Sequence, residues 1–134
     1  MLKAKDIMRR DVMCIKRQTP ACKAAELLVE SDTTCLPVVE DDMTLVGVVG
    51  EKDLLRLFYA DQDQKDSTVE PFMTQPPVCY READSLRSII DSMLASSFRR
   101  VPVISRDGKV VGIVSRSDVL AYIVHTTQAE FAVH

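Results

Sequence analysis

The heptapeptide GIVSRSD, residues 112–118, is the stretch that decides the fold of this chain. A mainly β-branched apolar run from Val110 to Val114 leads into it, which predicts a strand. Ser115 can cap a following helix, because its hydroxyl can accept a free backbone N–H of the first turn. Asp118 then lies in that first turn, where the helix dipole favours a carboxylate. The stretch therefore predicts a strand that leads into a capped helix.

These seven residues allow two interpretations. In the first, they only start a helix. In the second, they form a small-ligand site, because the exposed N–H groups of a helix N-terminus bind phosphate and a nearby carboxylate can accept the hydroxyls of a ribose. Taken alone, the stretch favours the structural interpretation, since short motifs often match by chance.

A second copy of the pattern, GVVGEKD, stands at residues 47–53, so that Gly47 corresponds to Gly112 and Asp53 to Asp118. We call the difference in residue number between Gly47 and Gly112 the repeat offset. The same difference separates further matching positions without a gap, namely Met8 and Met73, Cys14 and Cys79, Ser31 and Ser96, Pro37-Val38 and Pro102-Val103, Asp42 and Asp107, Val46 and Val111, and Leu55 and Leu120. A fixed period of this length indicates one supersecondary unit used twice. The chain is therefore an internal duplication.

Composition limits the function classes. The chain has 134 residues, of which 46% are apolar and 5% aromatic, with no Trp, so the core must be aliphatic. A net charge of −3 argues against nucleic acid or an anionic membrane as the main partner. No apolar run approaches the ~20 residues of a spanning helix, and residues 1–10 lack the apolar core of a secretory signal. We therefore expect no membrane insertion.

The cysteines and histidines predict no metal site. The four cysteines form no Cys-x-x-Cys pair, and both histidines fall near the C-terminus; the positions are Cys14, Cys22, Cys35, Cys79, His125 and His134. Zinc sites need clustered ligands, so we expect buried, reduced thiols and no bound metal. Reduced thiols fit a cytoplasmic location.

Apolar periodicity and turn residues predict the same elements in both halves. In the first half we expect a turn or helix at 4–8, a helix that Thr19 caps with Pro20 in its first position, a closing helix at 52–59, and strands at 12–15, 36–39 and 45–49. In the second half we expect a short helix at 69–73, a helix capped by Asp84, a closing helix at 116–124, and strands at 78–80, 101–104 and 110–114. Asp41-Asp42 and Asp107-Gly108 predict the hairpin turns.

Each half thus reads β-α-β-β-α, which predicts a mixed α/β (α+β) fold of two tandem repeats related by an approximate two-fold. One half alone would expose an apolar sheet face, so we expect the halves to bury both faces in one core. The predicted boundaries are a first repeat at 1–60, a polar linker at 61–68, a second repeat at 69–125 and a loose tail at 126–134.

Together these features resemble a pair of cystathionine-β-synthase (CBS) domains over residues 2–125. The resemblance rests on Met8 and Met73, on the strands that contain Pro37-Val38 and Pro102-Val103, and on the repeated Gly-x-x-x-x-x-Asp ends. It implies a regulatory module that binds AMP, ADP, ATP or S-adenosylmethionine in the cleft between the repeats and controls a separate, unidentified partner protein. The adenine nucleotide would be an effector, and no obligatory cofactor is implied.

The resemblance also implies which residues bind the ligand. In that family the Asp of Gly-x-x-Ser/Thr-x-x-Asp takes the ribose hydroxyls and the Ser/Thr assists, which points to Asp118 and Ser115. The segment before Pro-Val lines the base and phosphate pocket, where Arg99 and Arg100 could neutralise a phosphate; as an alternative they are solvated surface arginines. The implied ligand positions are Ser115, Arg116, Asp118, Arg99, Arg100, Val101, Pro102, Pro77 and Val78, with Lys52, Asp53 and Leu36 in the first half.

The first half departs from the family pattern. Gly50 stands where Ser115 stands in the second half, and residues 33–35 are Thr-Thr-Cys where the second half has Phe-Arg-Arg. The first half therefore lacks both the hydroxyl and the basic pair, while Asp53 remains and Lys52 could supply a charge. We expect one good site, in the second half, and one degraded or differently tuned site.

Two other function classes compete with nucleotide sensing. The first is a structural dimerisation module without a ligand, which Gly50 favours for the first half. The second is an enzyme, which we do not expect, because no His lies in a motif and both Asp residues are explained as helix-start residues. A homodimer is expected, since the closing helices are apolar on more than one face, at Leu54, Leu55, Leu57, Phe58, Val119, Leu120, Tyr122, Ile123 and Val124.

Overall fold

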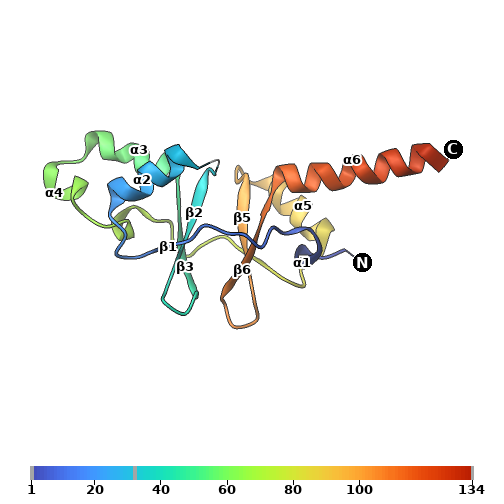
Figure 1. Ribbon diagram of the computed structural model, residues 1–134, viewed down its shortest axis with the longest axis horizontal. Helices are drawn as coiled ribbons and strands as arrows, with labels where there is room; N and C mark the ends of the chain where they lie inside the picture. Colours follow the sequence, from blue (N-terminus) through green and yellow to red (C-terminus); the bar gives the residue numbers. More distant parts are fainter. Residues whose placement is uncertain (1, 32, 134) are drawn as a thin grey trace. The chain divides into compact units, whose positions relative to one another are not determined.

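The computed structural model describes residues 2–31 and 33–133. His134, the last residue of the expected tail, lies outside the described residues, as do Met1 and Asp32. The chain divides into two units (Figure 1). The first-repeat unit comprises Met13–Val78 and Asp107–Val110, and the second-repeat unit comprises Met1–Val12, Cys79–Arg106 and Val111–His134.

The first-repeat unit holds a sheet of order β1-β2-β3, in which β1 is parallel and β3 antiparallel to β2. Helices α2 and α3 contact each other and the sheet (Figure 1). The elements are β1 (Ile15–Lys16), α2 (Ala21–Glu30), β2 (Cys35–Val39), β3 (Leu45–Gly50), α3 (Glu51–Leu55), the 3-10 helix η1 (Arg56–Tyr59), α4 (Gln62–Lys65) and the 3-10 helix η2 (Glu70–Phe72).

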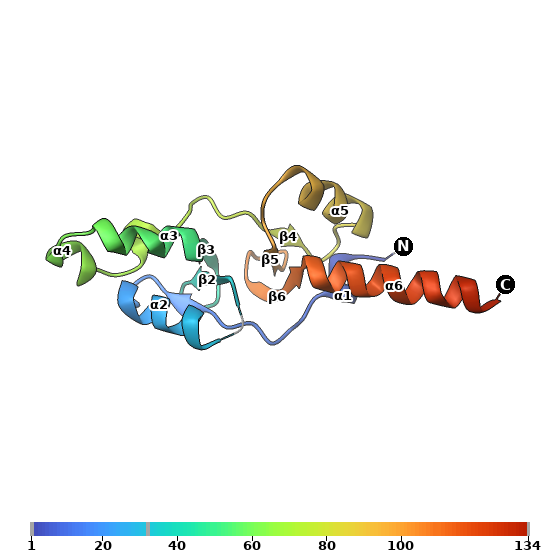
Figure 2. The same cartoon turned by 90° about the horizontal axis from the view of Figure 1, so that it is seen from above.

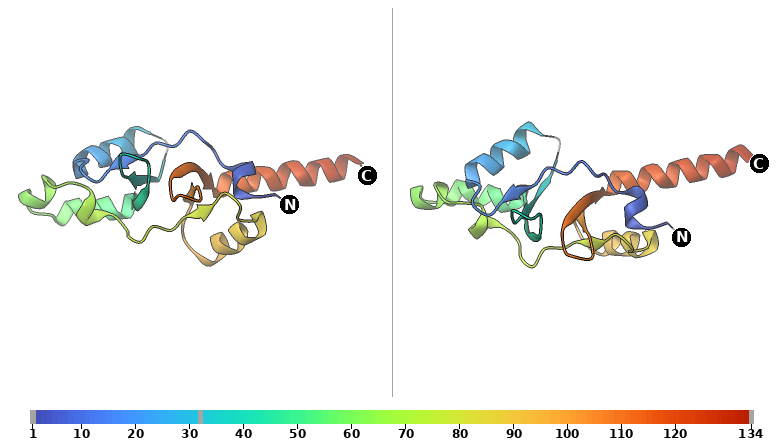
Figure 3. Two further views of the ribbon diagram at one scale, coloured as in Figure 1. Left: turned by 90° about the horizontal axis from the view of Figure 1, so that it is seen from below. Right: turned by 60° about the horizontal axis from the view of Figure 1, so that its bottom comes forward.

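The second-repeat unit holds an equivalent sheet of order β4-β5-β6. Its last helix, α6, projects well beyond the rest of the unit (Figures 2 and 3). The elements are α1 (Ala4–Ile7), β4 (Tyr80–Arg81), α5 (Leu86–Ala95), β5 (Arg100–Ile104), β6 (Val110–Ser115) and α6 (Arg116–Val133). The first residue of β6, Val110, belongs to the first-repeat unit.

Strand register confirms the duplication position by position. Ile15 pairs with Val38 across β1 and β2, and Tyr80 pairs with Val103 across β4 and β5. Both members of the second pair follow those of the first by the repeat offset. A one-residue slip would turn every side chain to the opposite face, so the two sheets bury equivalent faces.

The segment that precedes each repeat belongs to the unit of the other repeat. We call residues 2–9 and 67–74 the leading segments. The N–H of Ala4 donates to the carbonyl of Asp84 at 2.8 Å, and at the equivalent place the N–H of Val69 donates to the carbonyl of Thr19 at 2.9 Å. The repeats have thus exchanged their leading segments.

Two glycines mark where the leading segments cross the sheets. A Cβ built on Gly112 would lie 2.4 Å from the sulfur of Met8, and one on Gly47 would lie 2.7 Å from the sulfur of Met73. A side chain at either position would therefore crowd the leading segment, more tightly at Gly112, which explains why glycine stands at both.

The described residues hold two hydrophobic clusters, one in each unit, where the sequence predicted one shared core. Both clusters are mainly aliphatic, as expected. The first contains Ile15, Ala21, Ala24, Leu36, Val38, Val49, Leu54, Val69, Phe72 and Met73. The second contains Ala4, Met8, Tyr80, Ile89, Met93, Val101, Val103, Val114 and Val119. Each cluster includes residues of the exchanged leading segment, which therefore covers part of the apolar sheet face that one repeat alone would expose.

Several element boundaries differ from the predictions. The first strand of each repeat has only two residues and lies at the edge of its sheet. Helix α2 begins at Ala21 with Pro20 as its N-cap, and α5 begins after Ser85, whose hydroxyl accepts the N–H of Ser88. Thr19 and Asp84, predicted as the caps, accept backbone N–H groups of the preceding turns instead.

The predicted closing helix of the first half ends early and continues as η1, and the predicted linker contains α4. The predicted loose tail is wrong for its described part, because α6 runs to Val133. No Gly or Pro follows Arg116, so nothing in this stretch stops a helix. At the hairpins, Gly108 has a φ of 81° and Met43 a φ of 74°. The predicted Asp107-Gly108 turn thus places glycine where the backbone is left-handed, a conformation that favours glycine and that Met43 adopts at the equivalent place.

Candidate functional site

Ser115 and Asp118 cap α6 reciprocally. The hydroxyl of Ser115 accepts the N–H of Asp118 at 3.1 Å, and the carboxylate of Asp118 accepts the N–H of Ser115 at 3.0 Å. This is a capping box with aspartate at the third helical position. We call Ser115 and Asp118 the second-repeat box. It confirms the cap predicted from the sequence and holds the carboxylate at the helix start.

Asp118 has a second partner, which no motif in the sequence predicts. The Nε of Arg9 donates to Oδ1 of Asp118 at 3.0 Å, while Oδ2 accepts the N–H of Ser115. The side chain of Asp118 is 11% exposed and that of Arg9 is 71% exposed. A nearly buried carboxylate is therefore reached from solvent by an arginine of the exchanged leading segment.

Two of the three predicted arginines, Arg99 and Arg116, take different roles beside the box. Arg99 is exposed, and its carbonyl accepts the N–H of Arg116 at 2.9 Å, which fixes its main chain beside the start of α6. Arg116 turns toward α5, where its guanidinium donates to the carbonyls of Ser96 at 2.8 Å and Met93 at 3.4 Å. Arg116 thus caps the C-terminal end of α5, a favourable place for a cation.

The first repeat has the equivalent box without the hydroxyl. The carboxylate of Asp53 accepts the N–H of Gly50 at 2.8 Å, and the N–H of Glu51 donates to the carbonyl of Thr34 at 3.3 Å. Every one of these positions precedes its counterpart in the second repeat by the repeat offset. Lys52, the possible source of a charge, is exposed on the same helix.

The remaining predicted positions fall into three groups. Leu36, Val101 and Pro102 are fully buried, so their side chains belong to the cores and only their main chain could meet a ligand. Arg100 begins β5 and is half-buried. Pro77 and Val78 lie at the end of the first-repeat unit, and Val78 is 37% exposed. The structure thus groups Ser115, Asp118, Arg99 and Arg116 by direct contacts.

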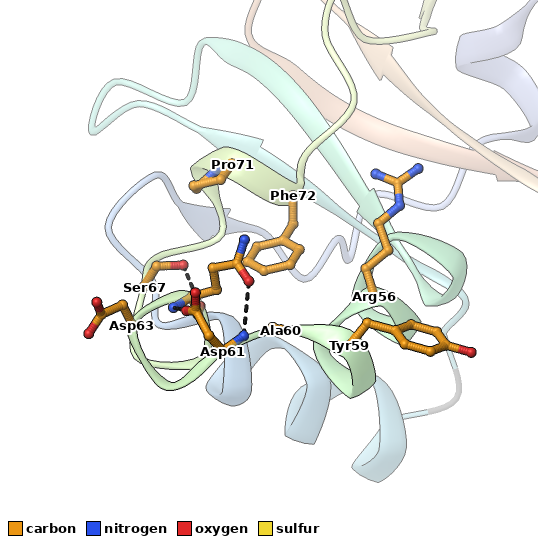
Figure 4. Close-up of a pocket in the computed structure, with 9 residues that line it drawn as sticks. Arg56, Tyr59, Ala60, Asp61, Asp63, Ser67, Pro71 and Phe72 are labelled. Carbon is orange, nitrogen blue, oxygen red and sulfur yellow. Dashed lines mark hydrogen bonds between the residues drawn. The ribbon is translucent and has the colours of Figure 1, made fainter.

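A pocket of about 500 Å³ lies within the first-repeat unit, and its lining includes no predicted site residue (Figure 4). The ring of Phe72 lies toward Ala60 and the start of α4, while Arg56 and Tyr59 point outward. Its lining comprises Arg56, Tyr59, Ala60, Asp61, Asp63, Gln64, Ser67, Pro71 and Phe72. Part of that wall is α4, which lies in the segment predicted to be a linker.

The thiols show no metal-binding arrangement. Among the residues that the structure describes, no group of three or more His, Cys, Asp or Glu side chains could hold a metal ion. Burial raises the pKa of the Cys14 and Cys79 thiols above the ordinary value. Within the same residues, no helix is both long and apolar enough to cross a lipid bilayer.

Comparison with known proteins supplies the family context. The family model described as CBS domain matches residues 4–60 and 69–125. The chain is 32% identical over 139 residues to "CBS domain-containing protein CBSX2, chloroplastic" of Arabidopsis thaliana, a match that covers 84% of this chain and 58% of that protein. The chain therefore spans less than two-thirds of the length of this curated relative.

Solved structures share the fold over nearly the whole chain. The crystal structure of CBSX2 in complex with AMP has a TM-score of 0.84 and 35% identity, and the match covers 95% of this chain and 99% of that one. The CBS domain pair of MJ0100, in complex with 5′-methylthioadenosine and S-adenosyl-L-methionine, has a TM-score of 0.80 and 23% identity, with 94% and 98% covered. The second likeness concerns the fold alone.

Proposed function

Because this chain belongs to the CBS domain family, we propose that it is a regulatory module that binds an adenosine nucleotide at the second-repeat box and controls a separate partner protein. One observation carries the proposal: Ser115 and Asp118 present a fixed carboxylate at the start of α6, in a chain that is 35% identical to a structure with bound AMP. In this proposal the module has no catalytic step of its own.

The chemistry of the box suits a nucleoside monophosphate. A carboxylate can accept about four hydrogen bonds, and Asp118 uses one of them for the cap and one for Arg9. Its remaining acceptor capacity suits ribose hydroxyls. Arg99, exposed beside the start of α6, and Arg100 at the start of β5 are the cations that would meet the phosphate.

Calorimetry with AMP tests the assignment to Asp118. Asp118→Ala is expected to weaken AMP binding by about 10- to 150-fold, since a hydrogen bond to a charged group is worth ~1.5–3 kcal/mol. Asp53→Ala is the matched control, because it removes the equivalent cap carboxylate in a repeat that lacks the hydroxyl and the arginine pair. If Asp53→Ala strongly weakens AMP binding and Asp118→Ala does not, the site lies in the first repeat instead.

The ligand class is tested with a panel. We expect AMP, ADP, ATP or S-adenosylmethionine to raise the unfolding temperature, because a ligand that binds only the folded state stabilises it by mass action. The 2′-deoxy analogue of the best ligand should bind more weakly, because the box then loses a hydrogen-bond partner. If no adenosine compound binds at millimolar concentration, the alternative of a structural dimerisation module replaces this proposal.

The proposed assembly is a homodimer. Apolar side chains are exposed at equivalent places of both repeats: Leu55 and Leu120 are 70% and 60% exposed, and Phe58 and Ile123 are 81% and 41% exposed. Helix faces this apolar are usually covered, and two-fold dimers are the commonest closure. Sedimentation at tens of micromolar should give a dimer, and Phe58→Asp should shift it toward monomer. A wild-type monomer at that concentration contradicts the proposal.

A further inference from the structure

Arg9 has a fixed backbone and an exposed side chain. Its N–H donates to the carbonyl of Ile113 at 2.9 Å, and its own carbonyl accepts the N–H of Ile113 at 2.9 Å. The preceding residue, Met8, is buried in the second cluster. The backbone is therefore held on both sides, while the side chain, 71% exposed, can rotate without breaking either bond.

The guanidinium of Arg9 occupies the oxygen that a ribose would need. Oδ2 of Asp118 accepts the N–H of Ser115 in the helix cap, so Oδ1 is the oxygen that the cap does not use. Arg9 donates to Oδ1 at 3.0 Å. A hydroxyl that approaches Asp118 must share this oxygen with Arg9 or displace it.

The first repeat has no equivalent arginine. Thr74 corresponds to Arg9 by the repeat offset and makes the same two backbone bonds, here with Val48, at 2.8 and 3.2 Å. A threonine side chain is too short to reach as an arginine does. Only the second repeat therefore has an arginine at this position that could compete with a ligand for the cap carboxylate. Thr74 of the first repeat shows which residue can replace Arg9 in a test.

We propose that Arg9 determines the ligand affinity of the second-repeat box by competing with the ribose hydroxyls for Asp118. This inference rests on the proposed function, since it concerns the same carboxylate. In this proposal the ribose hydroxyl displaces Arg9 from Oδ1, so the contact lowers the apparent affinity, because only molecules with Arg9 turned away bind. An exposed ion pair is weak, so its removal corresponds to a gain of up to about fivefold.

Titration of the whole chain with AMP at low and high salt tests the inference. Arg9→Thr, which copies Thr74, should bind AMP about two- to fivefold more tightly than wild type at low salt. The ratio of the two affinities should fall toward one at high salt, because salt screens the exposed competitor. Arg10→Thr removes the same charge from the exposed neighbouring residue and should leave the affinity within error of wild type.

A second background shows whether the effect passes through Asp118. Asp118→Asn keeps the shape of the side chain but removes its charge, so Arg9→Thr should give a smaller gain in that background than in wild type. An equal gain there overturns the inference, as does unchanged or weaker AMP binding in Arg9→Thr alone; both results leave the proposed function standing. Absence of AMP binding in wild type and Arg9→Thr alike overturns both proposals.

Discussion

Gly112→Ala should destabilise the second-repeat unit because the leading segment passes against this residue. A Cβ at this position would lie 2.4 Å from the sulfur of Met8 and 2.9 Å from the carbonyl oxygen of Arg9. The sulfur ends a flexible side chain that can turn away. The carbonyl cannot, because it accepts the N–H of Ile113, so the backbone of one partner must move.

The expected loss of unfolding free energy in Gly112→Ala follows from two opposing effects. Overpacking of this kind costs typically ~1–3 kcal/mol. Alanine also restricts the unfolded chain relative to glycine, which returns ~0.4–1 kcal/mol. Gly112→Ala should therefore lower the free energy of unfolding by about 1–2 kcal/mol. Gly47→Ala should cost less, because its Cβ would lie 3.1 Å from the nearest main-chain oxygen, that of Thr74.

Urea denaturation followed by circular dichroism measures both variants. In a Met8→Ala background, which carries its own core cost, Gly112→Ala should cost less than in wild type, because the sulfur clash is absent while the clash with the carbonyl of Arg9 remains. The two substitutions are then non-additive, as expected for residues in contact. If Gly112→Ala unfolds at the same or a higher urea concentration than wild type, the tight crossing of the leading segment is refuted.

Three further predictions concern local features. Gly50→Ser should stabilise the chain by a few tenths of a kcal/mol in urea denaturation, because it installs the cap that Ser115 provides and the nearest atom to a new Cβ lies at 3.6 Å. Arg116→Ala should cost ~1–3 kcal/mol of unfolding free energy, since it removes charged hydrogen bonds to the end of α5. Peptide mapping after iodoacetamide treatment should find the exposed Cys22 alkylated before Cys14. Burial raises the pKa of the Cys14 thiol, so a smaller fraction of it is thiolate, and its alkylation should become faster only as the pH rises.

The features that sequence predicted best are those set by neighbours along the chain. The cap of α6 needs only Ser115 and Asp118 at a spacing of three residues, and both hydrogen bonds are present. The duplication is visible because one repeat offset relates the two halves. Helix α4 was missed because its four residues, Gln62–Lys65, are all exposed and leave no apolar period.

The features that sequence missed are set by distant parts of the chain. Arg9 and Asp118 are 109 residues apart, and no local pattern indicates that they meet. The alignment of the two repeats does mark Arg9 as unusual, because the equivalent residue in the other repeat is Thr74 and the two differ in type. Its meaning depends on the exchange of leading segments, which periodicity alone does not reveal.

The exchange of leading segments explains why the second-repeat box depends on the first repeat. Residues 2–9 are joined by sequence to the first repeat but bond to Ser85, Ile113 and Asp118 in the second-repeat unit. A second repeat expressed alone would therefore lose Met8 from its core and Arg9 from its carboxylate. Any change that loosens the leading segment therefore acts on Asp118 through Arg9. Under the proposed function, the stability of the crossing at Gly112 and the ligand affinity at the box should change together.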